Sequence, residues 1–442
     1  MEKSKFVINY PKKINLDHYN ILVNKPKVLY GLPPEIKFCK KCAMSNQKPI
    51  SSIEFKNKLS KKKIGININK DGICDPCVVN QKKNYEINWN EREKKLRNLC
   101  DKYRKKDGSY DCLVPGSGGK DSFYASHILK NKYKMNPLTI TWSPAIYTDW
   151  GWKNFKSWIG SGQDNYLINP NGLVRRLLTR IAIEKLFHPF QPFILGQRIA
   201  PIKIAALKDI KLVFYGENES EVNNPISEFD NPKRDKKTWT QSKKNQNDII
   251  ISGLKVKNLI NYFGINKNEL SSYLPIDEEL VDKKKIQVHY LGYYLKWDQQ
   301  GKYYYAKKYG NFIPSPERTP GTYSKYNSID DKMDDLHFFT TLIKFGIGRV
   351  NYDVSREIRD NDVTKEEAKK LVKKYQYEFP TRFENELFDY LSITSKEFPI
   401  ASKMFEQPIM NKEYFLKLAD KFRSPHIWYY KSGDWFLRKT FY

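Results

Sequence analysis

The sequence predicts an α/β fold with a doubly wound parallel sheet, and three observations lead to this prediction. Short apolar runs alternate with longer amphipathic stretches from residue 111 onward, which is typical of buried strands and the helices that cover them. A glycine-rich loop lies between the first expected strand and the first expected helix. The composition, with 40% hydrophobic and 14% aromatic residues in a chain of 442, is typical of a folded protein with two or three domains.

The expected strands and helices alternate along residues 96–312, which we interpret as the central domain. Strands are predicted at 110–114, 138–142, 165–168, 211–215 and 286–295. Helices are predicted at 89–105, 122–133, 151–159, 173–187 and 201–208. In a parallel sheet of this kind the ligand lies beyond the carboxyl ends of the strands, so the segments that follow the strands are the first places to look for a site.

Other segments flank or interrupt this domain. Residues 1–95 have few long periodic stretches and are predicted to form a zinc-ribbon-like module. Residues 220–284 are rich in lysine, asparagine and serine and are interpreted as an insertion. Residues 313–442 are expected to be mainly helical, and Thr364 and Glu367 form a capping box for a helix that runs to about residue 375.

The formal net charge of +28 makes nucleic acid a candidate partner. The lysines are spread along the whole chain, however, and the basic runs at 61–63 and 283–285 are interpreted as solvated faces. Nucleotides and acidic sugars are attracted by the same field, and no segment resembles an RNA-binding module. Nucleic acid is therefore not the expected partner.

Two further patterns predict where in the cell the protein lies. No apolar run of about 18 residues is present, so no membrane span is predicted. The first residues lead into no apolar segment of a secretory signal, and we therefore expect a cytoplasmic protein. In that compartment six cysteines argue against a disulfide framework.

Four of the cysteines form two Cys-x-x-Cys pairs. Paired thiolates of this spacing are typical of a tetrahedral zinc site, and redox or sulfur-carrying cysteines are the alternative. Cys100 and Cys112 are interpreted as core thiols. The expected Zn²⁺ ligands are Cys39, Cys42, Cys74 and Cys77.

The glycine-rich loop is predicted to bind the phosphates of ATP. A Walker A loop would have glycine at Val114 and a hydroxyl residue at Asp121, so a P-loop NTPase is disfavoured. The string at 117–122 instead resembles the pyrophosphate loop of the ATP pyrophosphatase (PP-loop) superfamily, which implies that superfamily's sheet and ATP as co-substrate. The expected ATP-binding residues, which include two at the ends of strands, are Ser117, Gly118, Gly119, Lys120, Asp121, Ser122, Trp142 and Gly216.

Three residues near the expected phosphate site are candidate catalytic groups: Lys120, Asp121 and Glu217. Lys120 is expected to offset negative charge on the phosphates. Asp121 or Glu217 is expected to help hold Mg²⁺, which prefers oxygen ligands and phosphate. For Asp121 the alternative is an N-terminal helix cap, because aspartate is favoured at that position.

Several strings resemble the N-acetyl sugar amidotransferase family of lipopolysaccharide and flagellar-sugar biosynthesis. They lie at 147–154, 164–167, 176–180, 188–193, 215–218 and 344–349, and with the cysteine pairs and the loop the resemblance covers about residues 35–380. It implies an enzyme that uses ATP and ammonia to turn an acetamido group into an acetamidino group. It also implies substrates such as pseudaminic-acid-type sugars or UDP-linked N-acetylated uronic acids.

Substrate contacts are expected from basic residues of two segments. One of the arginines near 176–180 is a candidate for a carboxylate or phosphate contact, and so are the basic residues that flank the glycines at 346 and 348. His188 and His337 are interpreted as packing or hydrogen-bonded side chains rather than catalytic bases. The substrate-binding candidates are Arg176, Arg180, Lys344 and Arg349.

Ammonia needs a source outside this chain. Neither Cys100 nor Cys112 lies in a setting typical of a glutaminase nucleophile, so a separate glutaminase subunit is expected, as the resemblance also implies, and free ammonia is the alternative source. A tRNA-thiolating enzyme of the same superfamily is the alternative function. It would use the cysteine pairs for sulfur or iron–sulfur chemistry.

Overall fold

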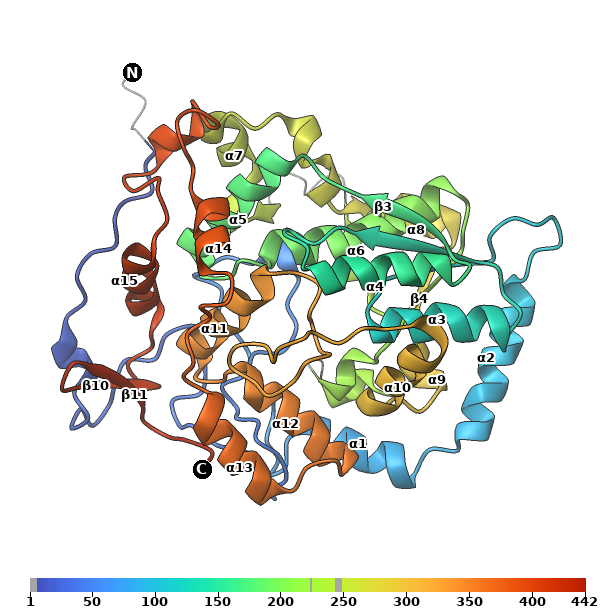
Figure 1. Ribbon diagram of the computed structural model, residues 1–442, viewed down its shortest axis with the longest axis horizontal. Coiled ribbons are helices and arrows are strands. Elements are labelled where there is room, and N and C mark those ends of the chain that lie inside the picture. Colours follow the sequence, from blue (N-terminus) through green and yellow to red (C-terminus); the bar gives the residue numbers. More distant parts are fainter. Residues whose placement is uncertain (1–5, 223–224, 243–248) are drawn as a thin grey trace.

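The main sheet has five strands in the order β3–β2–β1–β4–β9, of which β3 and β4 are labelled in Figure 1. The computed structural model describes residues 6–222, 225–242 and 249–442. All adjacent strands of this sheet are parallel. The strands are β1 (Cys112–Pro115), β2 (Pro137–Trp142), β3 (Asp164–Ile168), β4 (Leu212–Tyr215) and β9 (Gln287–Tyr290).

Helices cover both faces of this sheet, as the alternating βα pattern predicts. Val114 of β1 packs in one apolar cluster with side chains of α3 (Lys120–Asn131). Its neighbour Leu113 packs in another cluster with side chains of α6 (Gln191–Leu207). Because successive side chains of a strand point to opposite faces, α3 and α6 lie on opposite sides of the sheet. The other helices that alternate with these strands are α4 (Asp149–Gly160) and α5 (Gly172–Leu186).

Two sequence-based boundaries were wrong. The helix predicted at 201–208 is the last part of α6, which begins at Gln191 and contains Pro201 in its interior, a position that usually ends or begins a helix. The strand predicted at 286–295 ends at Tyr290, and the short helix α9 (Leu291–Tyr294) follows. There the N–H of Gly292 donates to the carbonyl of Gly216 at 2.8 Å, so the chain turns across the end of β4 instead of extending the sheet.

The segment interpreted as an insertion packs against the central core. Trp239, Leu259 and Phe263 lie in the same apolar cluster as Leu113 of β1. Its regular elements are short, which agrees with its short apolar runs. The strands and α-helices are β5 (Thr240–Gln241), β6 (Ile250–Ile251), β7 (Leu254–Lys255), α7 (Val256–Phe263), β8 (Ile276–Asp277) and α8 (Glu278–Lys284), and short 3-10 helices lie at Ile226–Glu228, Lys236–Thr238 and Lys267–Tyr273.

The N-terminal and C-terminal parts complete the molecule. The capping box at Thr364 is confirmed, because its N–H donates to Glu367 Oε2 at 2.9 Å and α13 ends at Tyr375 as predicted. Within the described ranges no helix is long and apolar enough to cross a membrane. The remaining elements are α1 (Asp75–Tyr85), α2 (Trp89–Tyr103), α10 (Gln299–Gly310), α11 (Met333–Phe345), α12 (Arg349–Asp360), α13 (Lys365–Tyr375), α14 (Glu384–Leu391), α15 (Lys412–Phe422), β10 (Trp428–Lys431) and β11 (Asp434–Leu437).

Candidate active site and metal centre

The glycine-rich loop joins the carboxyl end of β1 to the N-terminus of α3, where the sequence places it. Gly118 has φ +86°, and a Cβ atom there would lie 2.6 Å from the Cα of Phe155 on α4. A Cβ on Gly116 would lie 2.1 Å from the Cβ of Ser122. These two positions therefore require glycine, and the loop is held tightly against its neighbours with the free N–H groups of α3 at its end.

The loop forms one wall of a cleft of about 560 Å³ beyond the carboxyl ends of the strands. This is the position that the ligand-placement rule for open α/β sheets predicts. Gly118 is absent from the lining because it faces α4. The other predicted ATP-binding residues all line the cleft, and so does Glu217: Ser117, Gly119, Lys120, Asp121, Ser122, Trp142 and Gly216.

Lys120 and Asp121 form an ion pair at the first turn of α3. The Nζ of Lys120 lies 2.6 Å from Oδ2 of Asp121, and the indole N–H of Trp297 donates to Oδ1 at 3.3 Å. The N-cap of α3 is Gly119, and no side chain caps this helix. Asp121 is therefore not used as a helix cap, and its carboxylate lies in the cleft wall.

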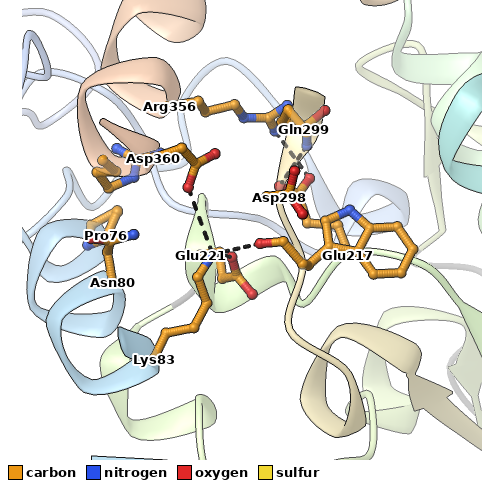
Figure 2. Close-up of a pocket in the computed structure, with 11 residues that line it drawn as sticks. Pro76, Asn80, Lys83, Glu217, Glu221, Asp298, Gln299, Arg356 and Asp360 are labelled. Carbon is orange, nitrogen blue, oxygen red and sulfur yellow. Dashed lines mark hydrogen bonds and ion pairs between the residues drawn. The ribbon is translucent and has the colours of Figure 1, made fainter. Parts of the chain in front are cut away.

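Glu217 follows β4 and lies between two cavities. It lines the cleft and also a smaller cavity that reaches the N-terminal module (Figure 2). Its Oε1 accepts a hydrogen bond from Gln299 at 3.2 Å, and its Oε2 accepts one from Arg356 of α12 at 3.0 Å. In the smaller cavity Lys83 of α1 pairs with Glu221 at 2.8 Å, so α1 and the segment after β4 are tied together.

Sequence analysis missed three aspartates that line the cleft from the segment before and within α11. Burial raises the pKa of Asp330, and a hydrogen bond from Ser117 of the glycine-rich loop opposes that rise. Burial also raises the pKa of Asp334 well above its ordinary value. The acidic residues grouped ahead of an apolar helix were a signal in the sequence. Nothing there indicated that they lie beside the loop.

Asp331, the third aspartate, fixes the segment after β2. Its carboxylate accepts the backbone N–H groups of Ala145 at 2.6 Å and Ile146 at 3.2 Å, and that of Met333 at 3.0 Å. Burial raises its pKa to about 6 despite these bonds. Among the described residues these carboxylates form no group with ligand atoms close enough to hold an ion, whereas the four paired cysteines do.

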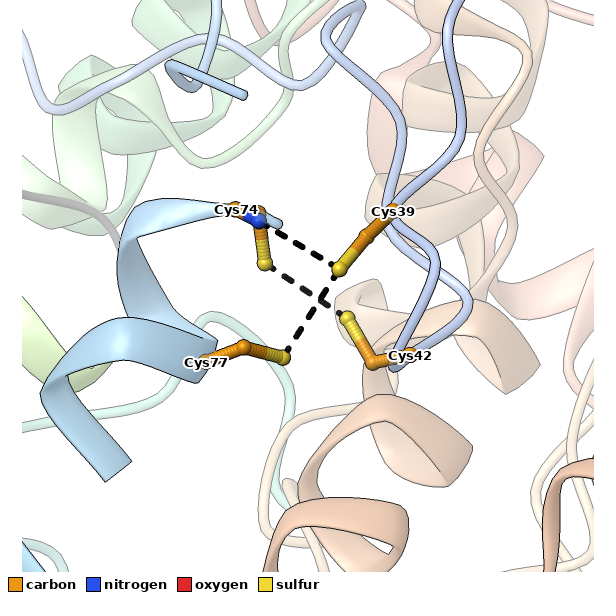
Figure 3. Close-up of side chains that lie close together, drawn as sticks. All are labelled: Cys39, Cys42, Cys74 and Cys77. Atoms are coloured by element: carbon orange, nitrogen blue, oxygen red, sulfur yellow. Dashed lines mark hydrogen bonds between the residues drawn. The ribbon is translucent and has the colours of Figure 1, made fainter. Parts of the chain in front are cut away.

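The four paired cysteines form a buried cluster in the N-terminal module, with all sulfur atoms within 4.8 Å of one another (Figure 3). Cys39 and Cys77 Sγ atoms lie 3.9 Å apart, and those of Cys42 and Cys74 lie 3.6 Å apart. A tetrahedral zinc with 2.3 Å bonds to sulfur needs sulfur atoms about 3.8 Å apart. The cluster therefore fits zinc.

Hydrogen bonds favour a thiolate at one of the four sulfur atoms, that of Cys39. Hydrogen bonds from the thiols of Cys42, Cys74 and Cys77 lower the pKa of Cys39. The backbone N–H groups of Cys74 and Lys41 donate to the same sulfur at 3.3 and 3.4 Å. Zinc binds the thiolate form, which these contacts favour at Cys39.

The four substrate-binding candidates do not lie together. Arg176 donates to the carbonyl of Tyr390 at 3.1 Å and pairs with Glu397, outside the cleft. Arg180 is fully buried and donates to the carbonyl of Leu391 at 2.9 Å.

The other two candidates lie on the C-terminal helices. Arg349 is buried against Asp353 at 3.2 Å within α12. Lys344 of α11 donates to the carbonyl of Leu186 at 2.7 Å and lines a second cavity beside the cleft. Lys344 therefore reaches a cavity that adjoins the cleft.

One comparison with known proteins bears on the C-terminal part of the chain. Residues 320–441 match the family model described as the C-terminal domain of WbpG-like LPS biosynthesis proteins. An uncharacterized protein of Methanocaldococcus jannaschii is 37% identical over 81 residues, which is 18% of this chain and 28% of that protein. The chain thus spans little more than a quarter of the length of that relative. Residues 320–441, which include α11, α12 and the aspartate at 330, are similar to a domain of lipopolysaccharide biosynthesis proteins.

Proposed function

We propose that this chain is an ATP-dependent amidotransferase of surface-polysaccharide biosynthesis, which converts the acetamido group of an N-acetylated sugar into an acetamidino group. The observation that carries the proposal is the glycine-rich loop at the N-terminus of α3, in a cleft at the carboxyl ends of parallel strands. The similarity of residues 320–441 to a lipopolysaccharide biosynthesis domain supports a sugar substrate.

The reaction needs two steps because an amide carbonyl is a poor electrophile. The amide oxygen attacks the α-phosphorus of ATP, and pyrophosphate leaves. Ammonia then adds to the resulting imidate carbon, the oxygen leaves with AMP, and a proton is released. The product is the acetamidine, about one mass unit lighter than the substrate. Because ATP and ammonia are supplied in the cytoplasm, we place the reaction there.

Residues of the cleft have distinct roles in this proposal. The loop at 117–122 and the free N–H groups of α3 bind the phosphates, and Lys120 offsets their charge. Asp121 and Glu217 both line the cleft beside the loop, so their carboxylates fit Mg²⁺, which binds oxygen ligands and phosphate. Zinc in the cysteine cluster is structural, because the four thiols are buried and lie apart from the cleft lining.

A separate glutaminase subunit supplies the ammonia. Cys100 and Cys112 are buried in the apolar cluster on the α3 face of the sheet. Burial raises the pKa of Cys100 to about 12, so its thiol is a poor nucleophile. Within the part of the chain that the structure describes, no cysteine is therefore placed to release ammonia from glutamine.

The test is AMP and pyrophosphate release from ATP, with ammonium chloride supplied and N-acetylated sugars offered one at a time. AMP release that depends on one sugar, with a product about one mass unit lighter, is the expected result. AMP release that depends on tRNA instead would replace this proposal with the thiolation alternative. Burial of the four paired cysteines disfavours that alternative, because sulfur transfer needs a thiol that reaches the substrate.

A further inference from the structure

A second cavity of about 320 Å³ adjoins the cleft, and its charges are almost all positive. We call it the basic chamber. The two cavities share Ile194, His337 and Phe338 in their walls. The charged side chains that line the chamber are Lys48, Lys63, Arg198, Lys344, Arg356 and the single carboxylate Glu54.

Two of these lysines are buried without a carboxylate partner. Lys48 is 3% exposed and donates to the carbonyl of Val222 at 2.5 Å, and Lys344 is 6% exposed and donates to the carbonyl of Leu186. Among the described residues neither has a carboxylate at ion-pair distance. Burial lowers the pKa of each to about 7. An anion placed near them would favour their charged forms.

The acidic residue of the chamber does not neutralise them. Glu54 Oε1 accepts the hydroxyl of Ser52 at 3.1 Å, and Oε2 accepts the amide of Asn57 at 3.0 Å. Lys63 in turn donates to Asn57 Oδ1 at 2.8 Å. Arg198 donates to the carbonyl of Ser52 at 3.1 Å. Arg198 and Arg356 also pair with Glu219 and Glu217, which lie outside the chamber lining. The three lysines are held by neutral acceptors, so the chamber keeps an excess of positive charge.

Two histidines that the sequence analysis interprets as packing or hydrogen-bonded side chains line the chamber, and one of them, His337, also lines the cleft. The rings of His188 and His337 stack 5.2 Å apart at 24°. Burial lowers the pKa of both well below the ordinary value, so both are neutral. Within the described ranges the buried Nδ1 of His337 has no hydrogen-bond partner. This polar atom belongs to a side chain that lines both cavities, so a molecule that spans them would meet it.

We propose that the basic chamber binds an anionic group of the sugar substrate, a carboxylate or a phosphate, while the acetamido group lies in the cleft beyond His337. This inference rests on the proposed function and assigns its substrate site. A volume of about 320 Å³ suits a sugar acid or a sugar phosphate, and is too small for a nucleic-acid strand. The net charge of +28 draws such anions toward the protein.

Calorimetric titration of the full chain with three probes tests the proposal, with a non-hydrolysable ATP analogue present to fill the cleft. N-acetylneuraminate offers a carboxylate without phosphate, UDP-N-acetylglucosamine offers phosphates without a carboxylate, and N-acetylglucosamine offers neither. One or both of the anionic probes should bind and the neutral sugar should not. The probe that binds identifies the group that the chamber recognises.

Variants locate the binding. Lys344→Met and Lys48→Met should each lower the affinity for the anionic probe at least tenfold. Lys62→Gln, a change at an exposed lysine, should bind the probe like the wild type. Binding that both methionine variants leave unchanged, or no binding of either anion, overturns the proposal. Two variants on different segments keep the test valid if one of them fails to fold, which circular dichroism will show.

The same titrations separate this inference from the proposed function. If an anionic probe binds but the ATP analogue does not, the result supports the anion site in the basic chamber and contradicts the amidotransferase proposal. If the analogue binds and neither anion does, the chamber proposal fails and the amidotransferase proposal stands.

Discussion

The guanidinium of Arg356 donates to Oε2 of Glu217 at 3.0 Å, and this pair lies where three cavities meet. Glu217 lines the cleft and the smaller cavity of Figure 2, and Arg356 lines that smaller cavity and the basic chamber. Arg356 belongs to the segment that matches the lipopolysaccharide biosynthesis domain. The pair therefore joins that segment to the end of β4, next to the glycine-rich loop.

Arg356→Gln should lower the rate of AMP formation about tenfold while leaving the melting temperature nearly unchanged. The variant removes the cation that orients Glu217, and a pair that is about a quarter exposed contributes at most about 1 kcal/mol to stability. Steady-state kinetics and a thermal melt measure the two effects. Arg92→Gln, which disrupts a pair with Asp230 outside the cleft lining, is the control and should keep full activity. Unchanged turnover in Arg356→Gln would contradict the prediction.

Asp121→Asn should reduce AMP formation by about a hundredfold or more, because the cleft loses a charged oxygen ligand beside the phosphate site. The fold should persist, since the carboxylate is partly exposed and is not used as a helix cap. Asp107→Asn on an exposed turn is the matched control. An active Asp121→Asn enzyme would remove Asp121 from the proposed machinery.

Gly118→Ala should abolish binding of ATP, whereas Gly108→Ala should not. Both glycines have positive φ, +86° and +79°, so the backbone cost of about 1 kcal/mol is common to the two variants. Only at Gly118 does the new methyl group meet another atom, 2.6 Å away, and at Gly108 nothing lies within 4 Å. Fluorescence titration with an ATP analogue measures the difference. Equal binding by the two variants would show that the loop tolerates displacement.

Cys74→Ser should lower the zinc content and the melting temperature together, because a structural zinc site contributes directly to folding. Cys100→Ser, which changes a buried thiol outside the cluster, should keep its zinc. Elemental analysis and melting curves with and without a chelator provide the measurement. A chelator that leaves the wild-type melting temperature unchanged would argue against a structural metal.

Asp331 should make the protein less stable as the pH rises from about 4 to about 6. Burial raises its folded pKa from 3.8 to about 6, so in this range the folded state holds a proton that the unfolded state has released. Its contribution to stability is present below pH 4 and falls by about 3 kcal/mol as the pH passes the folded value. Urea unfolding at pH 4.5, 5.5 and 7 should show this trend in the wild type relative to Asp331→Asn. A pH-independent difference between the two proteins would refute it.

The parts of the fold set by local sequence were predictable. Leu113 and Val114 lie in an apolar run that is buried on both faces, which is why the strand was recognised. The paired cysteines and the glycine-rich loop are likewise local patterns. The four paired cysteines do lie together in one cluster, as their spacing predicts. Pro201 misled the prediction because proline at a helix start and proline inside a helix look alike in a sequence.

The site could be predicted only where its residues lie together in the chain. Asp330 meets Ser117, and Lys48 faces the same chamber as Lys344, through contacts between distant segments. Spacing cannot reveal such contacts. Nor can it tell an arginine that binds a substrate from one such as Arg180, which the fold uses to hold backbone carbonyls.

Contacts between residues near the two ends of the chain have a consequence for how the protein is made. Ile8 pairs with Phe405, the hydroxyl of Tyr19 donates to the carbonyl of Arg423 at 2.9 Å, and Arg438 donates to the carbonyl of Asn20 at 2.7 Å. During synthesis the early segment leaves the ribosome hundreds of residues before these partners exist. Its packing is therefore completed only after residues 405–438 have been synthesised, so the N-terminal segment is among the last parts of this chain to reach its native contacts.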